Sequence, residues 1–168
     1  MPDETPLDRL NVAEPAEAER ELLACCAARR WADELLARRP YHDLAALRQM
    51  SATVLGELAW DDVEQALAAH PRIGERPAGD GREAAWSRGE QAGVAGSSAR
   101  IEQDIAAGNA AYEERFGHVF LICATGLSGE EMLAALRERL DNDPEAERDV
   151  VRGELAKIVE LRLGKAFG

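Results

Sequence analysis

The sequence predicts an all-α protein, a single-domain bundle of about eight helices over residues 1–168 with an irregular loop at the candidate active site. Ala, Leu, Glu and Arg, which favour helices, are abundant, whereas only 5% of the residues are aromatic. Apolar residues also recur at the spacing of one helical face through most of the chain. A length of 168 residues suits one domain that buries a core of its own.

The first half of the chain is expected to contain four helices, each with a start or stop signal. Residues 1–13 are polar, contain two prolines and are expected to pack loosely. The first helix begins near Pro15 and runs through Cys26, and the second lies around Trp31–Leu36 and stops before Pro40. The third is capped by Asp43 and has an apolar stripe from Leu44 to Leu58. The fourth is short and is capped by Asp61 or Asp62. The short helix is expected to end at His70, because Pro71 disfavours the helical conformation of the residue before it.

The second half begins with a glycine-rich loop and continues with four more helices. Residues 73–96 contain six glycines. The first of these helices is short and covers Trp86–Val94, and the second is long, is capped by Ser97 or Ser98 and stops at Gly117. The third is capped by Ser128, and the last runs from Pro144 to about Gly164. The apolar run 119–124 is too short to distinguish an extended segment from the start of a helix.

Charge and cysteine content exclude several classes of function. The net charge of −12 disfavours nucleic acid or an anionic membrane as a partner. An anionic substrate would therefore need a local cationic pocket. The three cysteines have neither a disulfide framework nor a metal-ligand spacing, and no signal peptide or membrane span of roughly 20 apolar residues is visible. We expect reduced thiols and a cytoplasmic location.

His70 is the first of three polar residues that interrupt apolar helical faces. Val63, Leu67 and His70 fall at i, i+4 and i+7, which places the imidazole on the inward face of its helix. One interpretation is a core histidine bonded to a backbone carbonyl. The other is a general acid or base, because a helix C-terminus favours an imidazolium and histidine titrates near neutral pH.

Glu90 is the second such residue, since it shares a stripe with Trp86 and Val94. Its carboxylate either reaches outward to water or is held in a pocket by hydrogen bonds, because an unpaired buried charge is too costly. Arg162 is the third and lies near the centre of a face formed by Val151, Leu155 and Ile158. It needs an acidic partner from protein or substrate, unless the last turn frays and the side chain reaches water. His118 is a weaker candidate, and His42 looks structural.

Three motifs in this order closely resemble the OHCU decarboxylase family, which acts on 2-oxo-4-hydroxy-4-carboxy-5-ureidoimidazoline in urate degradation. They are His70-Pro71-Arg72-Ile73-Gly74-Glu75, Ser87-Arg88-Gly89-Glu90-Gln91-Ala92-Gly93 and Asn109-Ala110-Ala111-Tyr112-Glu113-Glu114-Arg115-Phe116-Gly117. Phe120–Ala124 and Lys157–Leu163 also look like that family, so the resemblance spans nearly the whole chain. The stretch from Arg76 to Trp86 matches no motif, and His118 stands where a more apolar residue is expected.

The resemblance implies an all-α, cofactor-free carboxy-lyase without a metal site, commonly a homodimer, that releases CO2 and leaves (S)-allantoin as the last step from urate. It implies that His70, as general acid, Glu90 and Arg162 are catalytic. The substrate contacts that it implies are Pro71, Ser87, Arg88, Gly89, Glu90, Gln91, Phe120, Leu121, Ile122, Cys123 and Ala124.

Two other functions remain open from the sequence. The first is a non-catalytic helical module whose pocket binds a ureide or purine metabolite. The second is an acidic interaction protein without a pocket. The second predicts that His70, Glu90 and Arg162 are scattered over the surface.

Overall fold

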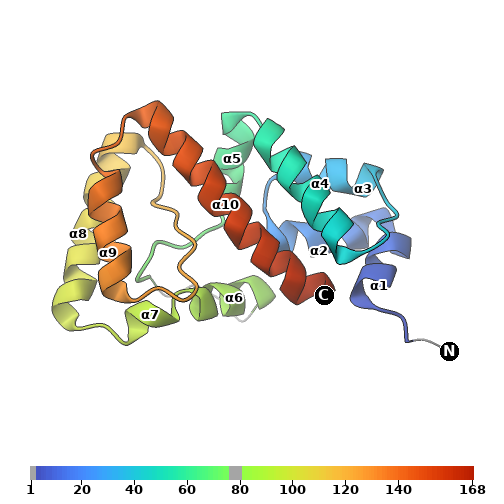
Figure 1. Ribbon diagram of the computed structural model, residues 1–168, viewed down its shortest axis with the longest axis horizontal. Coiled ribbons are helices and arrows are strands. Elements are labelled where there is room, and N and C mark those ends of the chain that lie inside the picture. Colours follow the sequence, from blue (N-terminus) through green and yellow to red (C-terminus); the bar gives the residue numbers. More distant parts are fainter. Residues whose placement is uncertain (1–2, 76–80) are drawn as a thin grey trace. The chain divides into compact units, whose positions relative to one another are not determined.

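The computed structural model describes residues 3–75 and 81–168. This part of the chain consists of helices joined by irregular segments and contains no strand (Figure 1). Its ten helices are α1 (Pro6–Val12), α2 (Pro15–Cys25), α3 (Arg29–Ala37), α4 (Leu44–Glu57), α5 (Trp60–Leu67), α6 (Arg82–Glu90), α7 (Ala92–Ala95), α8 (Ala99–Phe116), α9 (Gly129–Arg139) and α10 (Pro144–Phe167). The all-α prediction is confirmed, with ten helices in these residues where about eight were expected. Residues 76–80 of the glycine-rich loop lie outside the described residues.

The chain forms two compact units. The first unit contains Met1–Ala66 and Ala156–Gly168, and the second contains Leu67–Leu155. The last helix, α10, contributes its first half to the second unit and its second half to the first. The expectation of a single domain over residues 1–168 stays a prediction.

Most of the expected helix signals act as the sequence indicates. The side chains of Asp43, Ser98 and Ser128 accept hydrogen bonds from the backbone N–H groups in the first turns of α4, α8 and α9. Gly117 ends α8 with a φ of 78°, a left-handed conformation that favours glycine. Asp43 thus sets the start of α4 in the first unit, and the other three residues set the starts of α8 and α9 and the end of α8 in the second.

Two additional helix starts account for the higher count. Thr5 and Asp8 form a capping box around Pro6, which begins α1. This helix buries Leu7 and Leu10, so the segment differs from the loose packing expected of residues 1–13. The expected helix over Trp86–Val94 is interrupted at Gln91, and α6 and α7 are separate.

The core of the first unit is built around Trp31. This side chain is fully buried, and its Nε1 donates a hydrogen bond of 3.0 Å to the hydroxyl of Ser51 on α4. Cys26 is buried nearby in the chain, and burial raises the pKa of its thiol to about 12.

Of the helices that the structure describes, none is long and apolar enough to cross a membrane.

Replacing Ser51 with alanine should lower the free energy of unfolding by about 1–3 kcal/mol, because the Trp31 N–H is then buried without an acceptor. Urea denaturation measures the change. Thr53→Ala is the matched control on the same helix, since its exposed hydroxyl bonds only the Gln49 carbonyl one turn earlier. Equal losses in the two variants would contradict this account of the core.

Candidate active site

Three segments that carry predicted site residues converge on one apolar core in the second unit. This core contains Ile73 from the loop after His70, Val94 from α7, and Phe120, Ile122 and Ala124 from the segment after α8. The remaining buried members come from α8 and α9 and are Ile105, Tyr112, Met132, Leu133 and Leu136. The fold therefore brings onto a common base residues that belong to, or directly follow, the four segments of the resemblance in this unit.

His70 lies beyond its helix rather than on its inward face. The helix α5 ends at Leu67, and the backbone N–H of His70 donates to the Leu67 carbonyl in the turn that follows. The expected caps were also misplaced, because α5 begins at Trp60 and leaves Asp61 and Asp62 in its first turn. His70 is half-buried, so neither a fully buried core histidine nor a surface histidine describes it.

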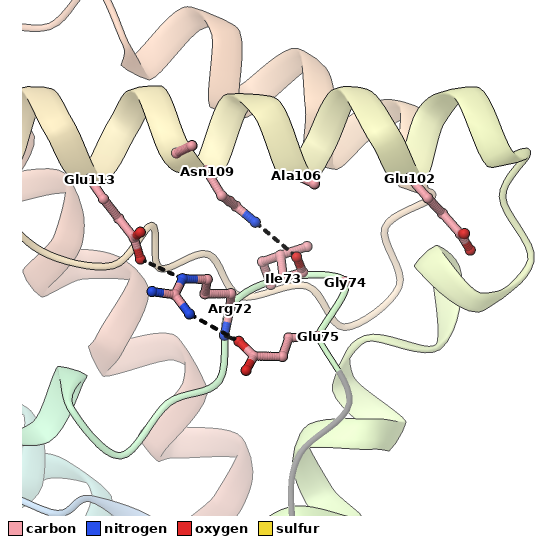
Figure 2. Close-up of a pocket in the computed structure, with 9 residues that line it drawn as sticks. Arg72, Ile73, Gly74, Glu75, Glu102, Ala106, Asn109 and Glu113 are labelled. Carbon is pink, nitrogen blue, oxygen red and sulfur yellow. Dashed lines mark hydrogen bonds and ion pairs between the residues drawn. The ribbon is translucent and has the colours of Figure 1, made fainter.

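The loop that follows His70 is held by hydrogen bonds from two directions. The backbone N–H of Gly74 donates to Gln91 Oε1 at 2.9 Å, and the amide of Asn109 donates to the Ile73 carbonyl at 2.9 Å. Gly74 has a φ of 88°, which a residue with a Cβ rarely adopts. These bonds connect the His70 loop to α8 and to the turn directly after Glu90, and Figure 2 shows Asn109 reaching Ile73.

Helix α6 places Glu90 and Ser87 in the interior and leaves Arg88 and Gly89 exposed. Glu90 is the last residue of α6 and is 9% exposed. A carboxylate that is this buried must be compensated by polar partners or by a ligand. The structure therefore favours the pocket interpretation of Glu90 over the outward one.

Gly93, in the same motif, is a position that needs glycine, because its backbone lies very close to the backbone of Leu127. A Cβ added at this position would overlap the carbonyl of Leu127, in the loop before α9, whereas a Cβ at Gly89 would meet open space. The glycine at position 93 thus allows α7 to pack against that loop.

Gly93→Ala should lower the free energy of unfolding by about 2 kcal/mol or more, because the new Cβ must displace backbone rather than a flexible side chain. The matched Gly89→Ala, inside helix α6, should raise stability by roughly 0.5–1 kcal/mol. Thermal unfolding of both variants measures the difference. A Gly93→Ala protein as stable as the wild type would contradict the close approach.

The segment after α8 has no regular secondary structure, yet several of its peptide groups are hydrogen-bonded. The Leu121 carbonyl accepts from Arg139 Nη1 at 2.7 Å, and the Cys123 N–H donates to Glu154 Oε1 at 3.2 Å. The Ala124 carbonyl accepts from the Leu127 N–H. Side chains from α9 and α10 thus fix a segment for which the sequence had predicted only backbone contacts with a substrate.

Arg139 belongs to a buried polar cluster that we call the Glu147 cluster, formed by Tyr112, Arg139, Asn142 and Glu147. Glu147 is fully buried and accepts from Arg139 Nη2 at 2.7 Å, from the Tyr112 hydroxyl at 2.6 Å and from the Asn142 amide at 3.1 Å. Burial raises the pKa of Glu147, but the hydrogen bonds from Arg139 and Tyr112 outweigh it and hold the pKa below its usual range. Burial and the neighbouring Glu147 raise the pKa of Tyr112.

Because the pKa of Glu147 is lowered by folding, its ionised form stabilises the protein above the ordinary glutamate pKa of roughly 4.3, and this contribution is lost as the pH falls through the folded-state value. Glu147→Gln should cost about 3–5 kcal/mol at pH 7, because it leaves Arg139 buried without its counter-charge. Its stability should also fall less steeply than that of the wild type on acidification.

Urea denaturation at pH 7 and at a series of pH values below roughly 4, down through the lowered pKa of Glu147, tests this prediction. Glu145→Gln, on the exposed side of the same turn of α10, is the control and should behave as the wild type. An equal dependence on pH in Glu147→Gln and wild type would contradict the assigned role.

Arg162 lies on the part of α10 that belongs to the first unit. It is only 5% exposed, so the interpretation in which a frayed last turn releases it to water is wrong. Its positive charge acts on the Cys26 thiol, where it opposes the larger effect of burial on the pKa. Since Glu90 and Arg162 are both buried and His70 is half-buried, the surface scatter expected of a pocketless interaction protein is not found.

A cavity of about 450 Å³ lies between the loop Arg72–Glu75 and helix α8 (Figure 2). Among the described residues, its lining includes the carboxylates of Glu75, Glu102 and Glu113 and the guanidinium of Arg72. Arg72 is paired with Glu113 at 2.8 Å and with Glu75 at 3.5 Å. An anionic ligand is disfavoured in this acidic cavity, and His70, Glu90 and Arg162 do not line it.

The described residues contain no group of three or more histidine, cysteine, aspartate or glutamate side chains that could hold a metal ion. The predicted site residues supply the imidazole of His70, the buried charges of Glu90 and Arg162, and the backbone amides of residues 120–124. Such groups can bind an anionic polar molecule and exchange protons with it.

Structure comparison defines the class of protein as an all-helical decarboxylase. The crystal structure of an OHCU decarboxylase in the presence of (S)-allantoin superposes with a TM-score of 0.75 at 31% identity and covers 86% of this chain and 95% of that one. An (S)-allantoin synthase with 19% identity shares the fold, with a TM-score of 0.70 over 96% of this chain and 54% of that one.

Sequence comparison gives the family. The sequence model of the OHCU decarboxylase family matches residues 11–164. The chain is 37% identical to the 2-oxo-4-hydroxy-4-carboxy-5-ureidoimidazoline decarboxylase of Amia calva, over 74% of this chain and 73% of that protein. It is 34% identical to the uric acid degradation bifunctional protein TTL of Arabidopsis thaliana over 89% of its length, and the match spans 47% of that longer protein. The chain therefore belongs to the OHCU decarboxylase family.

Proposed function

We propose that this protein decarboxylates 2-oxo-4-hydroxy-4-carboxy-5-ureidoimidazoline to (S)-allantoin and CO2, as the last step from urate to allantoin. The observation that carries the proposal is the family match over residues 11–164, which includes His70, Glu90 and Arg162. The burial of the two charged residues among these supports it, because a buried guanidinium can pair with the substrate carboxylate and a buried carboxylate can accept hydrogen bonds from its hydroxyl and N–H groups.

The reaction requires few groups from the protein. The bond between ring carbon 4 and the carboxylate breaks, and its electron pair passes towards carbon 5 as the adjacent C=N bond accepts electrons at nitrogen. A proton is then added to carbon 5, which creates the stereocentre, while the hydroxyl on carbon 4 becomes a carbonyl. From the carboxylate form the sum is one CO2 released and one proton taken up. The ring is its own electron sink, so the protein must supply orientation, charge stabilisation and a proton delivered to one face.

His70 is assigned the proton, as a general acid, a role that typically contributes roughly 10²–10⁴-fold. Pro71 restricts the backbone of His70, and the bonds at Ile73 and Gly74 hold the loop that follows. Both features support a fixed direction for the imidazole, which a stereospecific proton transfer needs.

Glu90 and Arg162 are assigned to the substrate. Glu90 would accept hydrogen bonds from the hydroxyl or the ring N–H groups, and Arg162 would bind a carboxylate or carbonyl oxygen with its planar fork. The segment Phe120–Ala124 would bind the ureido and ring edges through its backbone. Because Leu121 and Cys123 already have protein partners for one peptide group each, Ile122 is the best-supported contact of this segment.

The proposal includes three further properties. A homodimer follows from the family resemblance and is tested by light scattering on the purified protein. Absence of nucleic-acid binding is supported by the net charge of −12. A cytoplasmic location is supported by the sequence, because its three cysteines do not have the spacing of a disulfide framework.

His70→Asn should lower the rate of (S)-allantoin formation by about 10²-fold or more, because asparagine keeps hydrogen-bonding capacity but supplies no proton. Circular dichroism on freshly generated substrate is the measurement, since spontaneous decay of the substrate gives racemic product. His42→Asn, at an exposed position of the first unit, is the control and should keep full activity.

A folded His70→Asn protein with near wild-type stereospecific turnover would refute the assignment of His70. A wild-type protein that is stabilised against heat by (S)-allantoin but forms none would instead favour the non-catalytic binding module.

A further inference from the structure

The Glu147 cluster is unusual because it places a complete ion pair inside the second unit. Arg139 and Glu147 have side chains that are 8% and 0% exposed. Burying two charges costs several kcal/mol per ion, and apolar side chains of similar volume often give equal or greater stability. Stability alone therefore does not explain why an arginine is present here.

The guanidinium of Arg139 has two partners on opposite sides. Nε and Nη2 bond Glu147, and the remaining terminal nitrogen, Nη1, donates to the Leu121 carbonyl at 2.7 Å. The guanidinium carbon also lies 4.5 Å from the centre of the Phe120 ring. The ion pair thus orients a donor at the backbone of the segment that follows α8.

A second side chain bonds the same segment two residues further on. Glu154, on α10, accepts from the Cys123 N–H at 3.2 Å. The segment has no partner strand in the described structure, so its peptide groups are not held by a sheet. Arg139 and Glu154 supply the hydrogen bonds that a neighbouring strand would give.

The side chains of the segment alternate, which defines its two edges. Phe120, Ile122 and Ala124 pack into the core of the second unit, whereas Leu121 and Cys123 are not part of that core. This alternation is typical of extended backbone, in which the peptide groups of alternate residues point to the same edge. Since Leu121 and Cys123 bond Arg139 and Glu154 on one edge, the N–H and C=O of Ile122 point to the other.

Ile122 has no hydrogen-bond partner for either peptide group within residues 3–75 and 81–168. Ile122 is 7% exposed, so its peptide groups are mostly buried. A donor and an acceptor on one residue match the ureido group and the ring amides of the proposed substrate, which also present N–H and C=O groups side by side.

We propose that Arg139 and Glu154 are positioning residues that hold segment 120–124 by one edge and thereby present the N–H and C=O of Ile122 to the ureidoimidazoline on the other. This inference rests on the proposed function. Neither residue touches the substrate, and both act through the backbone. The arginine is needed because its planar fork bonds Glu147 and Leu121 at once, which a lysine ammonium does not do.

The test is steady-state kinetics of (S)-allantoin formation by Arg139→Lys and Glu154→Ala. Both should raise KM roughly tenfold and leave kcat within about threefold, because a displaced Ile122 weakens binding of substrate and transition state alike. Glu154→Gln keeps an acceptor for the Cys123 N–H and should restore a near wild-type KM. Arg137→Lys, an exposed arginine on the same helix with its own ion pair to Asp104, should match the wild type.

KM values of Arg139→Lys and Glu154→Ala within twofold of wild type would overturn the proposal, as would a loss confined to kcat. A Glu154→Gln protein as impaired as Glu154→Ala would overturn it too, because the hydrogen bond would then not be the cause. If Arg139→Lys does not fold, the two Glu154 variants decide the question.

A wild type without turnover would refute the proposed function but not this inference, which amide hydrogen exchange then decides. Exchange at residues 121–124 should be about fivefold faster or more in Arg139→Lys and Glu154→Ala, and unchanged in Arg137→Lys. Equal exchange in all of these proteins would overturn the positioning role.

Discussion

The ion pair between Arg139 and Glu147 is the interaction on which the candidate site of the second unit depends. Arg139 uses Nε and Nη2 to bond Glu147, and its remaining terminal nitrogen, Nη1, donates to the Leu121 carbonyl. Tyr112 donates a further hydrogen bond to Glu147 from α8. One buried carboxylate therefore joins α8, α9 and α10 to an irregular segment that has no sheet to hold it. A charged centre fixes backbone geometry more sharply than apolar packing alone, because its bonds are directional.

The helices were largely predictable, because their signals are local. Asp43, Ser98 and Ser128 each cap the helix that the sequence assigned to them, and Gly117 ends α8. One of the two missed helix starts also has a local signal. The capping box at Thr5 was overlooked among prolines, although Thr5 and Asp8 have the required spacing. The break at Gln91 had no such signal, since the contact that Gly93 makes with Leu127 is between distant parts of the chain.

The site was predictable to the extent that its residues interrupt apolar faces. Glu90 and Arg162 were selected in this way, and both are buried. The same criterion, applied consistently, would have found Glu147, four residues before Val151 on the stripe that contains Arg162. Arg139 falls three residues after Leu136 on a similar stripe. The contacts of Glu154 and Asn109 with backbone groups were beyond reach of the sequence, because an irregular segment has no periodicity from which its neighbours follow. His70 shows the opposite error, since a helical face was extended three residues past the end of α5.

We expect the ligand to bind at the backbone of Ile122 rather than in the acidic cavity beside Arg72. Titration of the ¹⁵N-labelled protein with (S)-allantoin, followed by amide chemical shifts, tests it most directly. The largest chemical-shift changes should occur at Ile122 and the adjoining peptides, with smaller changes at His70 and Glu90. Changes concentrated at Arg72, Glu102 and Glu113, the residues that line the 450 Å³ cavity, would contradict it.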